Sequence, residues 1–300
     1  MNTDSLRLLN AETLARADKL GMAARFIVEG YMAGEHKSPY RGFAIEFSQH
    51  REYAPGDDVR HLDWKVLGKT DRYYIKQYEQ ETNFVAHLLI DGSESMKYAS
   101  GDTSKLDYAK MAIACLAFLI IKQRDAVSLS LFDDATRDEL PRGNTKNHLF
   151  NILERLSAFD AGGQTDLAGQ LHNVAKKSQR KGLVIVASDF FDDEDAVLDA
   201  VQHLRFVGHE VIALQVLDND EINFPFSGLI EFEGMENIPN IKTRPSEIRK
   251  SYLEQFKDFQ DKLEQGFRRN SCHFIKCDTS KPLEDVLASY LTFRREMSTK

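Results

Sequence analysis

The sequence predicts an α/β fold, a doubly wound, Rossmann-like and mostly parallel sheet with a small β-rich module at the amino-terminal end. Short and nearly continuous apolar runs, such as FVAHLLI and LVIVAS, are typical of central strands buried on both faces. Segments with helical spacing alternate with these runs, and none of the longer ones has an internal Pro. The connections are short enough for right-handed crossovers, which favours helices on both faces of one sheet.

The strand and helix pattern begins at residue 84. The expected strands are FVAHLLI at 84–90, AVSLSLF at 126–132, LVIVAS at 183–188, HEVIALQVL at 209–217 and CHFIKC at 272–277. The expected helices span 105–123, 146–156, 167–178, 194–206 and 249–267, with one more from Pro282. A possible β insertion covers about 222–245, where a short apolar run lies between the turn-like PFSG and GMEN.

Two domains are expected, divided between residues 82 and 83. Residues 83–300 carry the alternating pattern, whereas residues 1–82 begin with a helical segment around 11–30 and continue with short β-prone runs broken by Pro, Gly and Asp. We expect this first part to form a small β-rich module packed on the main sheet.

Composition narrows the class of partner and the compartment. A formal net charge of −8 over 300 residues lacks the concentrated basic surface that nucleic-acid binding needs. The longest apolar stretch, Met111–Ile121, is about half of what crosses a bilayer and is interpreted as a buried helix. The first twenty residues lack a signal-peptide pattern, and Cys115, Cys272 and Cys277 form no CxxC pair. These features predict a cytoplasmic protein without a membrane span, and no nucleic acid as partner.

Oxygen-bearing side chains follow two predicted strands and fill one glycine loop. Asp91, Ser93 and Ser95 follow the first strand, Thr165 lies in the loop DAGGQTD, and Asp189 follows LVIVAS. In an open α/β sheet, ligands bind at the carboxyl ends of the strands. Oxygen-only ligands suit a hard cation such as Mg²⁺, and two carboxylates with three hydroxyls leave one position for a carboxylate from another protein.

A simpler interpretation competes with the metal. Ser and Asp after strands are common turn and helix N-cap residues, so DxSxS alone fits capping equally well. Thr165 and Asp189 are expected at the same edge of the predicted sheet as DxSxS. The combination of all three segments therefore favours a metal site over capping.

These motifs resemble a known group. DGSESM, GGQTDL and ASDFF are similar to the three-part metal-ion-dependent adhesion site of von Willebrand factor A-like domains, over residues 84–217. The segment SPYRGFAIEFSQHREYAPGDDVRHLDWKVLGKTDRYYIKQYEQE resembles the family catalogued as domain of unknown function 58. The resemblance implies a sheet of the von Willebrand factor A type and a MoxR-type AAA+ ATPase, or its client, as partner.

The same resemblance implies roles for individual residues. It makes Ser93, Ser95 and Thr165 direct ligands of Mg²⁺, with Mn²⁺ as a possible substitute, and it has Asp91 and Asp189 holding waters or hydroxyls around the ion. One departure is that Phe190 and Phe191 follow Asp189 where many A-domains have Gly. We expect one of these two rings to be buried and the other exposed.

Three functions compete at this point. The first is a Mg²⁺-dependent protein-interaction module without catalysis, serving as adaptor or partner of the ATPase. The second is a metal-dependent hydrolase with Asp91 as nucleophile or Asp189 as base, although the chain has no P-loop, GxSxG or HExxH motif. The third is a structural protein whose motif binds no metal.

Overall fold

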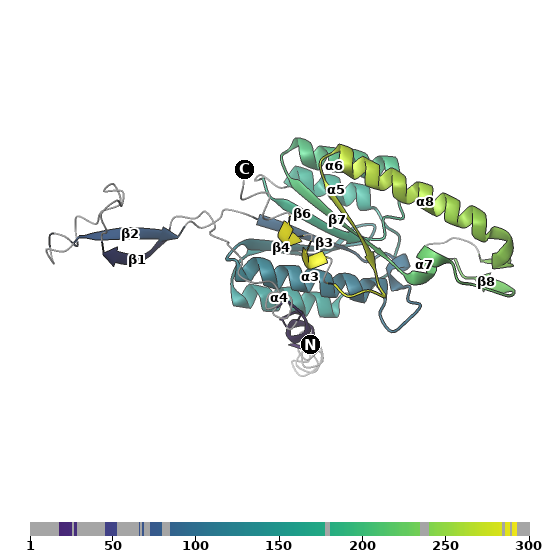
Figure 1. Ribbon diagram of the computed structural model, residues 1–300, viewed down its shortest axis with the longest axis horizontal. Helices are drawn as coiled ribbons and strands as arrows, with labels where there is room; N and C mark the ends of the chain where they lie inside the picture. Colours follow the sequence, from purple (N-terminus) through teal and green to yellow (C-terminus); the bar gives the residue numbers. More distant parts are fainter. Residues whose placement is uncertain are drawn as a thin grey trace, which may run out of the picture.

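The structure is a computed structural model of the 300-residue chain. It describes residues 18–25, 27–28, 46–52, 66, 68, 73–79, 85–177, 181–234, 240–283, 286–288 and 290–292. Figure 1 shows a central sheet with helices on both faces.

Six strands form the central sheet, in the order β10-β7-β6-β3-β4-β5. Neighbouring strands are parallel except β5, which runs antiparallel to β4 at the edge. The strands are β3 (Val85–Asp91), β4 (Ala126–Phe132), β5 (Thr136–Gly143), β6 (Leu183–Ser188), β7 (Glu210–Leu217) and β10 (His273–Asp278). The predicted α/β class with a mostly parallel sheet is confirmed.

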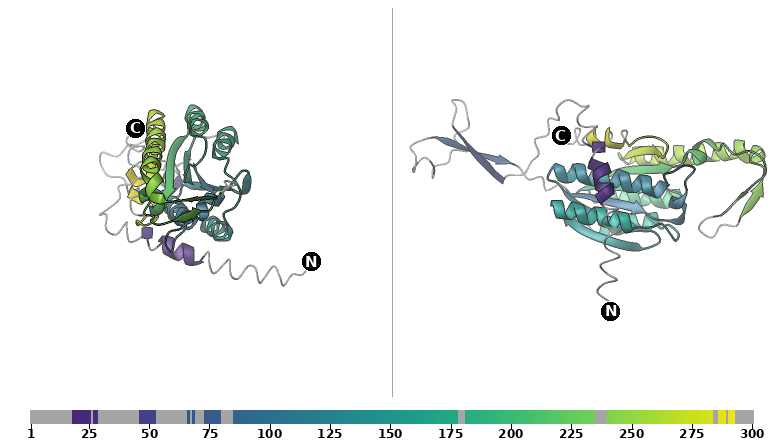
Figure 2. Two further views of the ribbon diagram at one scale, coloured as in Figure 1. Left: turned by 90° about the vertical axis from the view of Figure 1, so that its right-hand side faces the viewer. Right: turned by 90° about the horizontal axis from the view of Figure 1, so that it is seen from below.

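Helices cover the two faces of this sheet. One face carries α3 (Lys105–Lys122) and α4 (Lys146–Ala158), and the other carries α5 (Leu167–Lys177), α6 (Glu194–Phe206) and α8 (Pro245–Arg269) (Figures 1 and 2). Two short helices, η2 (Glu94–Lys97) and α7 (Asn219–Asn223), follow β3 and β7. All six residues of β6 are buried, because helices lie over both of its sides.

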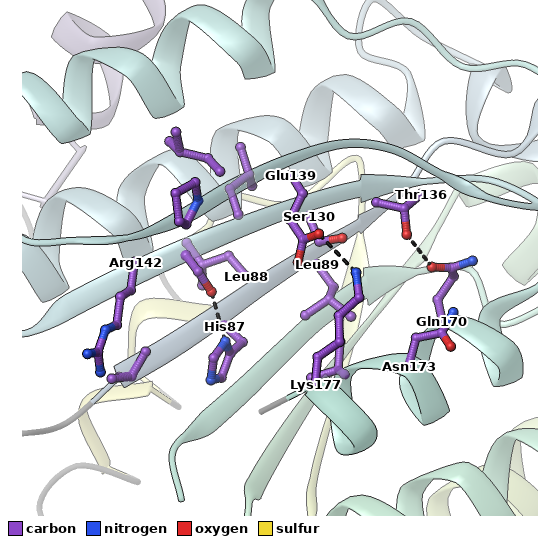
Figure 3. A pocket seen from close by; sticks show the side chains of 16 residues that line it. His87, Leu88, Leu89, Ser130, Thr136, Glu139, Arg142, Gln170, Asn173 and Lys177 are labelled. Carbon is purple, nitrogen blue, oxygen red and sulfur yellow. Dashed lines mark hydrogen bonds and ion pairs between the residues drawn. The ribbon is translucent and has the colours of Figure 1, made fainter. Parts of the chain in front are cut away.

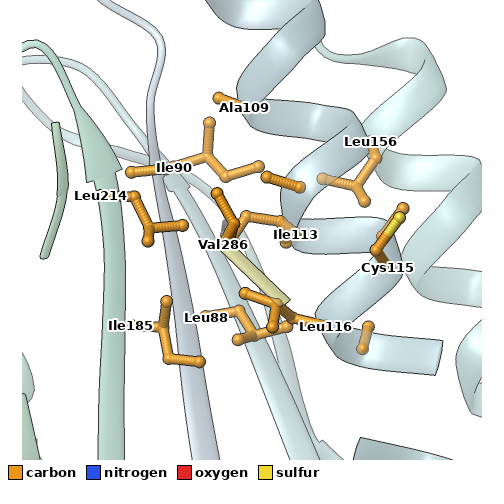
Figure 4. Close-up of a cluster of buried hydrophobic side chains, with 14 of the residues drawn as sticks. Leu88, Ile90, Ala109, Ile113, Cys115, Leu116, Leu156, Ile185, Leu214 and Val286 are labelled. Atoms are coloured by element: carbon orange, nitrogen blue, oxygen red, sulfur yellow. The ribbon is translucent and has the colours of Figure 1, made fainter. Parts of the chain in front are cut away.

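Helix α3 is the centre of the larger hydrophobic core. It contains the apolar stretch Met111–Ile121, and most of its residues are buried, as predicted for that stretch. Figure 4 shows Ile113 and Leu116 of α3 facing Leu88 and Ile90 of β3. Each such aliphatic side chain contributes about 1.5–3 kcal/mol to folding when it leaves water completely.

Most of the remaining elements match the expected ranges. The strand at 136–143 and the short helices η2 and α7 were not predicted, and α8 begins four residues before the expected start. The segment TRDELPRG at 136–143 contains Pro141, four charged residues and no apolar alternation, so it carries no strand pattern. It forms β5 as an edge strand, where only one neighbour is needed and Pro and charge are tolerated. Within the predicted insertion 222–245, β8 (Ile230–Phe232) and β9 (Ile241–Thr243) form a separate antiparallel pair.

Much of the amino-terminal module lies outside the described residues. Its strands β1 (Glu46–Glu52) and β2 (Tyr74–Glu79) pair antiparallel in their own two-stranded sheet. Residues 18–25, 27 and 28 are helical, with Ala24 and Val28 buried in the core around α3. The packing of the β-rich module on the main sheet and the boundary at residue 82 stay predictions.

Cys115, Cys272 and Cys277 are buried free thiols. Among the described residues, every helix is too short or too polar to cross a bilayer.

A cavity of about 340 Å³ opens on the face of β3, β4 and β5 beside α5 (Figure 3). Its lining includes an ion pair between Lys177 Nζ and Glu139 Oε2 at 3.0 Å. At its other end, His87 Nδ1 lies 2.8 Å from the hydroxyl of Ser128. Burial, aided by the neighbouring His209, lowers the pKa of His87 from 6.5 to about 4.

We therefore expect His87 to make the fold sensitive to acid. Between pH 6.5 and pH 4 the unfolded chain binds a proton that the folded protein does not, so the free energy of unfolding falls as the pH falls through that range. The loss assigned to His87 is about 2 kcal/mol, discounted for its partial exposure. Urea unfolding of wild type and His87→Gln at pH 7.5 and pH 4.5 measures it. An unchanged difference between the two proteins at both pH values would contradict this assignment.

Candidate metal centre

The candidate centre lies where the strand order of the sheet reverses. After β3 the chain continues to β4 on one side, and it later returns to β6 on the other side of β3. The loops that leave the carboxyl ends of β3 and β6 therefore diverge and frame a crevice, which is where ligands bind in open α/β sheets. Asp91 is the last residue of β3, and Asp189 directly follows β6.

The DxSxS loop is shaped around the buried carboxylate of Asp91. The Ser93 amide donates to Asp91 Oδ1 at 2.9 Å, and the hydroxyls of Ser93 and Ser95 lie 3.1 Å apart. Glycine is required at position 92, between Asp91 and Ser93, because a Cβ there would lie 2.2 Å from the Phe159 ring. Ser93 is fully buried and Ser95 is half-buried, so the pair runs from the interior towards the surface.

The glycine loop brings Thr165 to the same carboxylate. The Gly162 amide donates to the Gly92 carbonyl at 2.7 Å, and the Glu94 amide donates to the Gly163 carbonyl at 2.9 Å. Gly163 adopts a left-handed φ of 88°, which glycine accepts without strain. These two bonds fix the loop so that the Thr165 hydroxyl donates to Asp91 Oδ2 at 3.1 Å.

The turn after β6 supplies the third segment. The Ser188 hydroxyl donates to Asp91 Oδ2 at 2.7 Å and accepts from the Phe190 amide at 2.9 Å. Phe190 has a φ of 64°, a left-handed conformation that glycine adopts more readily than other residues. Phe190 is buried and Phe191 is 37% exposed, which confirms the expectation of one buried and one exposed ring.

Two buried carboxylates dominate the electrostatics of this crevice. Burial, and then the charge of Asp189, raise the pKa of Asp91 to about 7, while hydrogen bonds from Ser188 and Ser93 act in the opposite direction. Positive charge placed beside Asp91 therefore stabilises its ionised form.

Sequence reasoning missed an ammonium group beside Asp189. Lys105, the first residue of α3, is fully buried, and its Nζ lies 2.8 Å from Asp189 Oδ2 and 2.6 Å from Glu221 Oε1 of α7. Burial alone would lower the pKa of Lys105, but the charges of Asp189 and Glu221 outweigh it and raise that pKa. A lysine at a helix start is usually solvated, so its sequence position carried no signal. Sequence reasoning also missed the role of Ser188, because this residue is the last of the apolar strand β6.

The five predicted site residues thus gather at the carboxyl ends of β3 and β6, an edge of the sheet that we call the rim. Direct hydrogen bonds join Asp91 to Ser93 and Thr165, and Ser93 lies beside Ser95. Asp189 is linked to this group indirectly: its neighbour in sequence, Ser188, donates a hydrogen bond to Asp91. In the part of the chain that the structure describes, no three His, Cys, Asp or Glu side chains are placed to hold a metal together. Hydroxyls would therefore have to complete the ligand set, which suits a hard oxygen-seeking cation. That role stays a prediction.

Comparison with known proteins identifies the chain's relatives. A family model described as "Protein of unknown function DUF58" matches residues 49–262. The uncharacterized protein Rv1480 of Mycobacterium tuberculosis and the uncharacterized protein Mb1516 of Mycobacterium bovis are each 26% identical over 215 residues. Those alignments cover 70% of this chain and 67% of each relative.

Solved structures resemble the chain in fold. The conserved hypothetical protein BatB from Bacteroides thetaiotaomicron superposes with a TM-score of 0.50 at 16% identity, covering 72% of this chain and 100% of BatB. The VWA domain of SpRpn10 is a more distant match, with a TM-score of 0.41 at 13% identity over 69% of this chain and 94% of that domain. The chain therefore shares its overall fold with BatB.

The Ser188 hydroxyl gives a direct test of this geometry. Ser188→Ala leaves the buried Phe190 amide without its acceptor and removes a donor from Asp91, so we expect the free energy of unfolding to fall by about 1–3 kcal/mol. Ser157→Ala is the control, because the Ser157 hydroxyl donates to the Glu154 carbonyl of its own helix and lies outside the Asp91 network. Equal small losses in both variants, measured by chemical denaturation, would show that the Ser188 bonds do not organise the turn.

Proposed function

The chain belongs to the DUF58 family, and we propose that it is a protein-interaction module whose binding depends on a divalent cation, Mg²⁺ or Mn²⁺, held at this rim. The observation that carries the proposal is the convergence of oxygen donors from three segments. The Ser93 amide, the Thr165 hydroxyl and the Ser188 hydroxyl all donate to Asp91, although residues 91 and 165 lie 74 positions apart, and the Ser95 hydroxyl lies beside that of Ser93.

The chain's residues have distinct parts in this function. Asp91 accepts a hydrogen bond from the Thr165 hydroxyl and so orients that hydroxyl. It also accepts from the Ser93 amide and so orients the backbone at Ser93. Ser95 and Thr165 are partly exposed and can meet an incoming group. When bound, the cation supplies a Lewis-acidic point for an oxygen ligand from outside. That ligand is the carboxylate of an Asp or Glu of another protein.

The proposed partner follows from the family resemblance. It is a MoxR-type AAA+ ATPase, or a protein on which such an ATPase acts, in a reducing, cytoplasmic compartment. The three buried thiols are compatible with that compartment.

The burial of the two aspartates weighs against the hydrolase alternative. Asp91 is inaccessible and accepts three hydrogen bonds, so it is poorly placed to attack a substrate. Asp189 is also buried and is ion-paired with Lys105, which opposes a role as general base. Metal-dependent phosphoester turnover that disappears in a folded Asp91→Ala variant would restore that alternative.

Thermal melting tests whether the cation binds. We expect Mg²⁺ or Mn²⁺ at a concentration a hundred times its Kd to stabilise the folded protein by about 2.7 kcal/mol relative to EDTA. Ser93→Ala/Ser95→Ala should lose this increment, because two of the hydroxyl donors are gone. Ser128→Ala/Ser130→Ala removes two hydroxyls of the same spacing from β4 and should keep it. Identical melting of wild type in EDTA and in either cation would favour the structural alternative.

Binding to the proposed partner gives an independent test. We expect a purified MoxR-type ATPase of the same organism to bind the chain in Mg²⁺ and to release it in EDTA. The Ser93→Ala/Ser95→Ala variant should bind at least tenfold more weakly, a loss of about 1.4 kcal/mol. Surface plasmon resonance would measure both. Binding that is insensitive to EDTA and to this variant would mean that the interaction does not use the rim.

A further inference from the structure

A buried ion-pair network adjoins the candidate metal centre. Lys105 stands between Asp189, which belongs to the rim, and Glu221, which belongs to α7. Its side chain has no exposed surface, and that of Asp189 is 1% exposed. An unpaired lysine at such a position would cost several kcal/mol, so the two carboxylates hold it there as a cation.

The charge of Lys105 is poorly screened by solvent. The Phe191 ring lies 5.1 Å from Nζ and, through contacts with Phe256 and Phe259, is fixed against α8. Because the Lys105 side chain has no solvent-exposed surface, solvent screens its field at the rim only weakly. A fixed positive charge in that position repels a second cation and attracts an anion.

Glu221 holds Lys105 from the opposite side. Its Oε2 accepts from the Asp218 amide at 2.8 Å, as part of the capping box of α7. Its own carbonyl accepts from the Tyr252 hydroxyl at 2.9 Å. Glu221 is therefore an anchored counter-ion, and removal of its charge leaves the rim more positive.

We infer that Lys105 is a charge-setting and positioning residue of the rim: it weakens binding of the divalent cation there and strengthens binding of a carboxylate ligand to the cation-loaded rim. The inference rests on the proposed function. It follows from one ammonium group within hydrogen-bond distance of Asp189 and out of contact with solvent. The rim then binds its cation weakly until the partner's carboxylate adds a compensating negative charge.

The test uses Mn²⁺ as metal probe and acetate as carboxylate probe. Mn²⁺ affinity is measured from the free-ion electron paramagnetic resonance signal, and acetate affinity from water-proton relaxation of the Mn²⁺-loaded protein. Lys105→Gln keeps amide donors but removes the charge, so we expect about tenfold tighter Mn²⁺ binding and severalfold weaker acetate binding. Glu221→Gln removes a charge of the opposite sign and should shift both affinities in the opposite directions, by smaller factors.

The opposite signs separate electrostatics from damage to the structure. A merely structural role predicts that both variants weaken both affinities, and that result would overturn the inference. If Lys105→Gln does not fold, Glu221→Gln decides alone: weaker Mn²⁺ with tighter acetate supports the inference, and any other combination refutes it. Wild-type protein that binds no Mn²⁺ would instead refute the proposed function itself, before either variant is compared.

Discussion

The buried carboxylate of Asp91 is the constraint on which the rim depends. It ends a central strand that is covered on both faces, where a carboxylate without partners would cost several kcal/mol. Three donors satisfy it: the Ser93 amide, the Thr165 hydroxyl and the Ser188 hydroxyl. Since these donors come from three segments of the chain, satisfying one side chain fixes the relative position of all three segments.

Asp189 has a second and different environment. Lys105 neutralises it, and Lys105 in turn contacts Glu221 of α7. The loop between η2 and α3 is tied to the same helix, because the Ser100 amide donates to Asp218 and the Tyr98 hydroxyl donates to Asp220. Substitutions in α7 would therefore act on the rim without touching any predicted ligand.

Aromatic side chains connect the turn after β6 to α8. Phe191 contacts Phe256 and Phe259, and Tyr252 stacks on Phe224 at 4.5 Å between ring centroids. Such pairs add about 0.5–1.5 kcal/mol each beyond the area that they bury. A partner that engages the exposed Phe191 would meet a ring already held in place by α8, and would lose little side-chain entropy there.

The sequence alone determined the parallel sheet, most helix ranges and the identity of the five clustered oxygen-bearing residues. Continuous apolar runs and strand-end polar residues are local features, so they can be recognised without knowing what packs against them. Only the tertiary structure revealed β5, Ser188 and the Lys105 network. The antiparallel edge strand lacks an apolar pattern because one neighbour is enough to hold it. The charge of Lys105 becomes part of the rim only because folding brings together residues 105, 189 and 221 and buries Lys105 and Asp189.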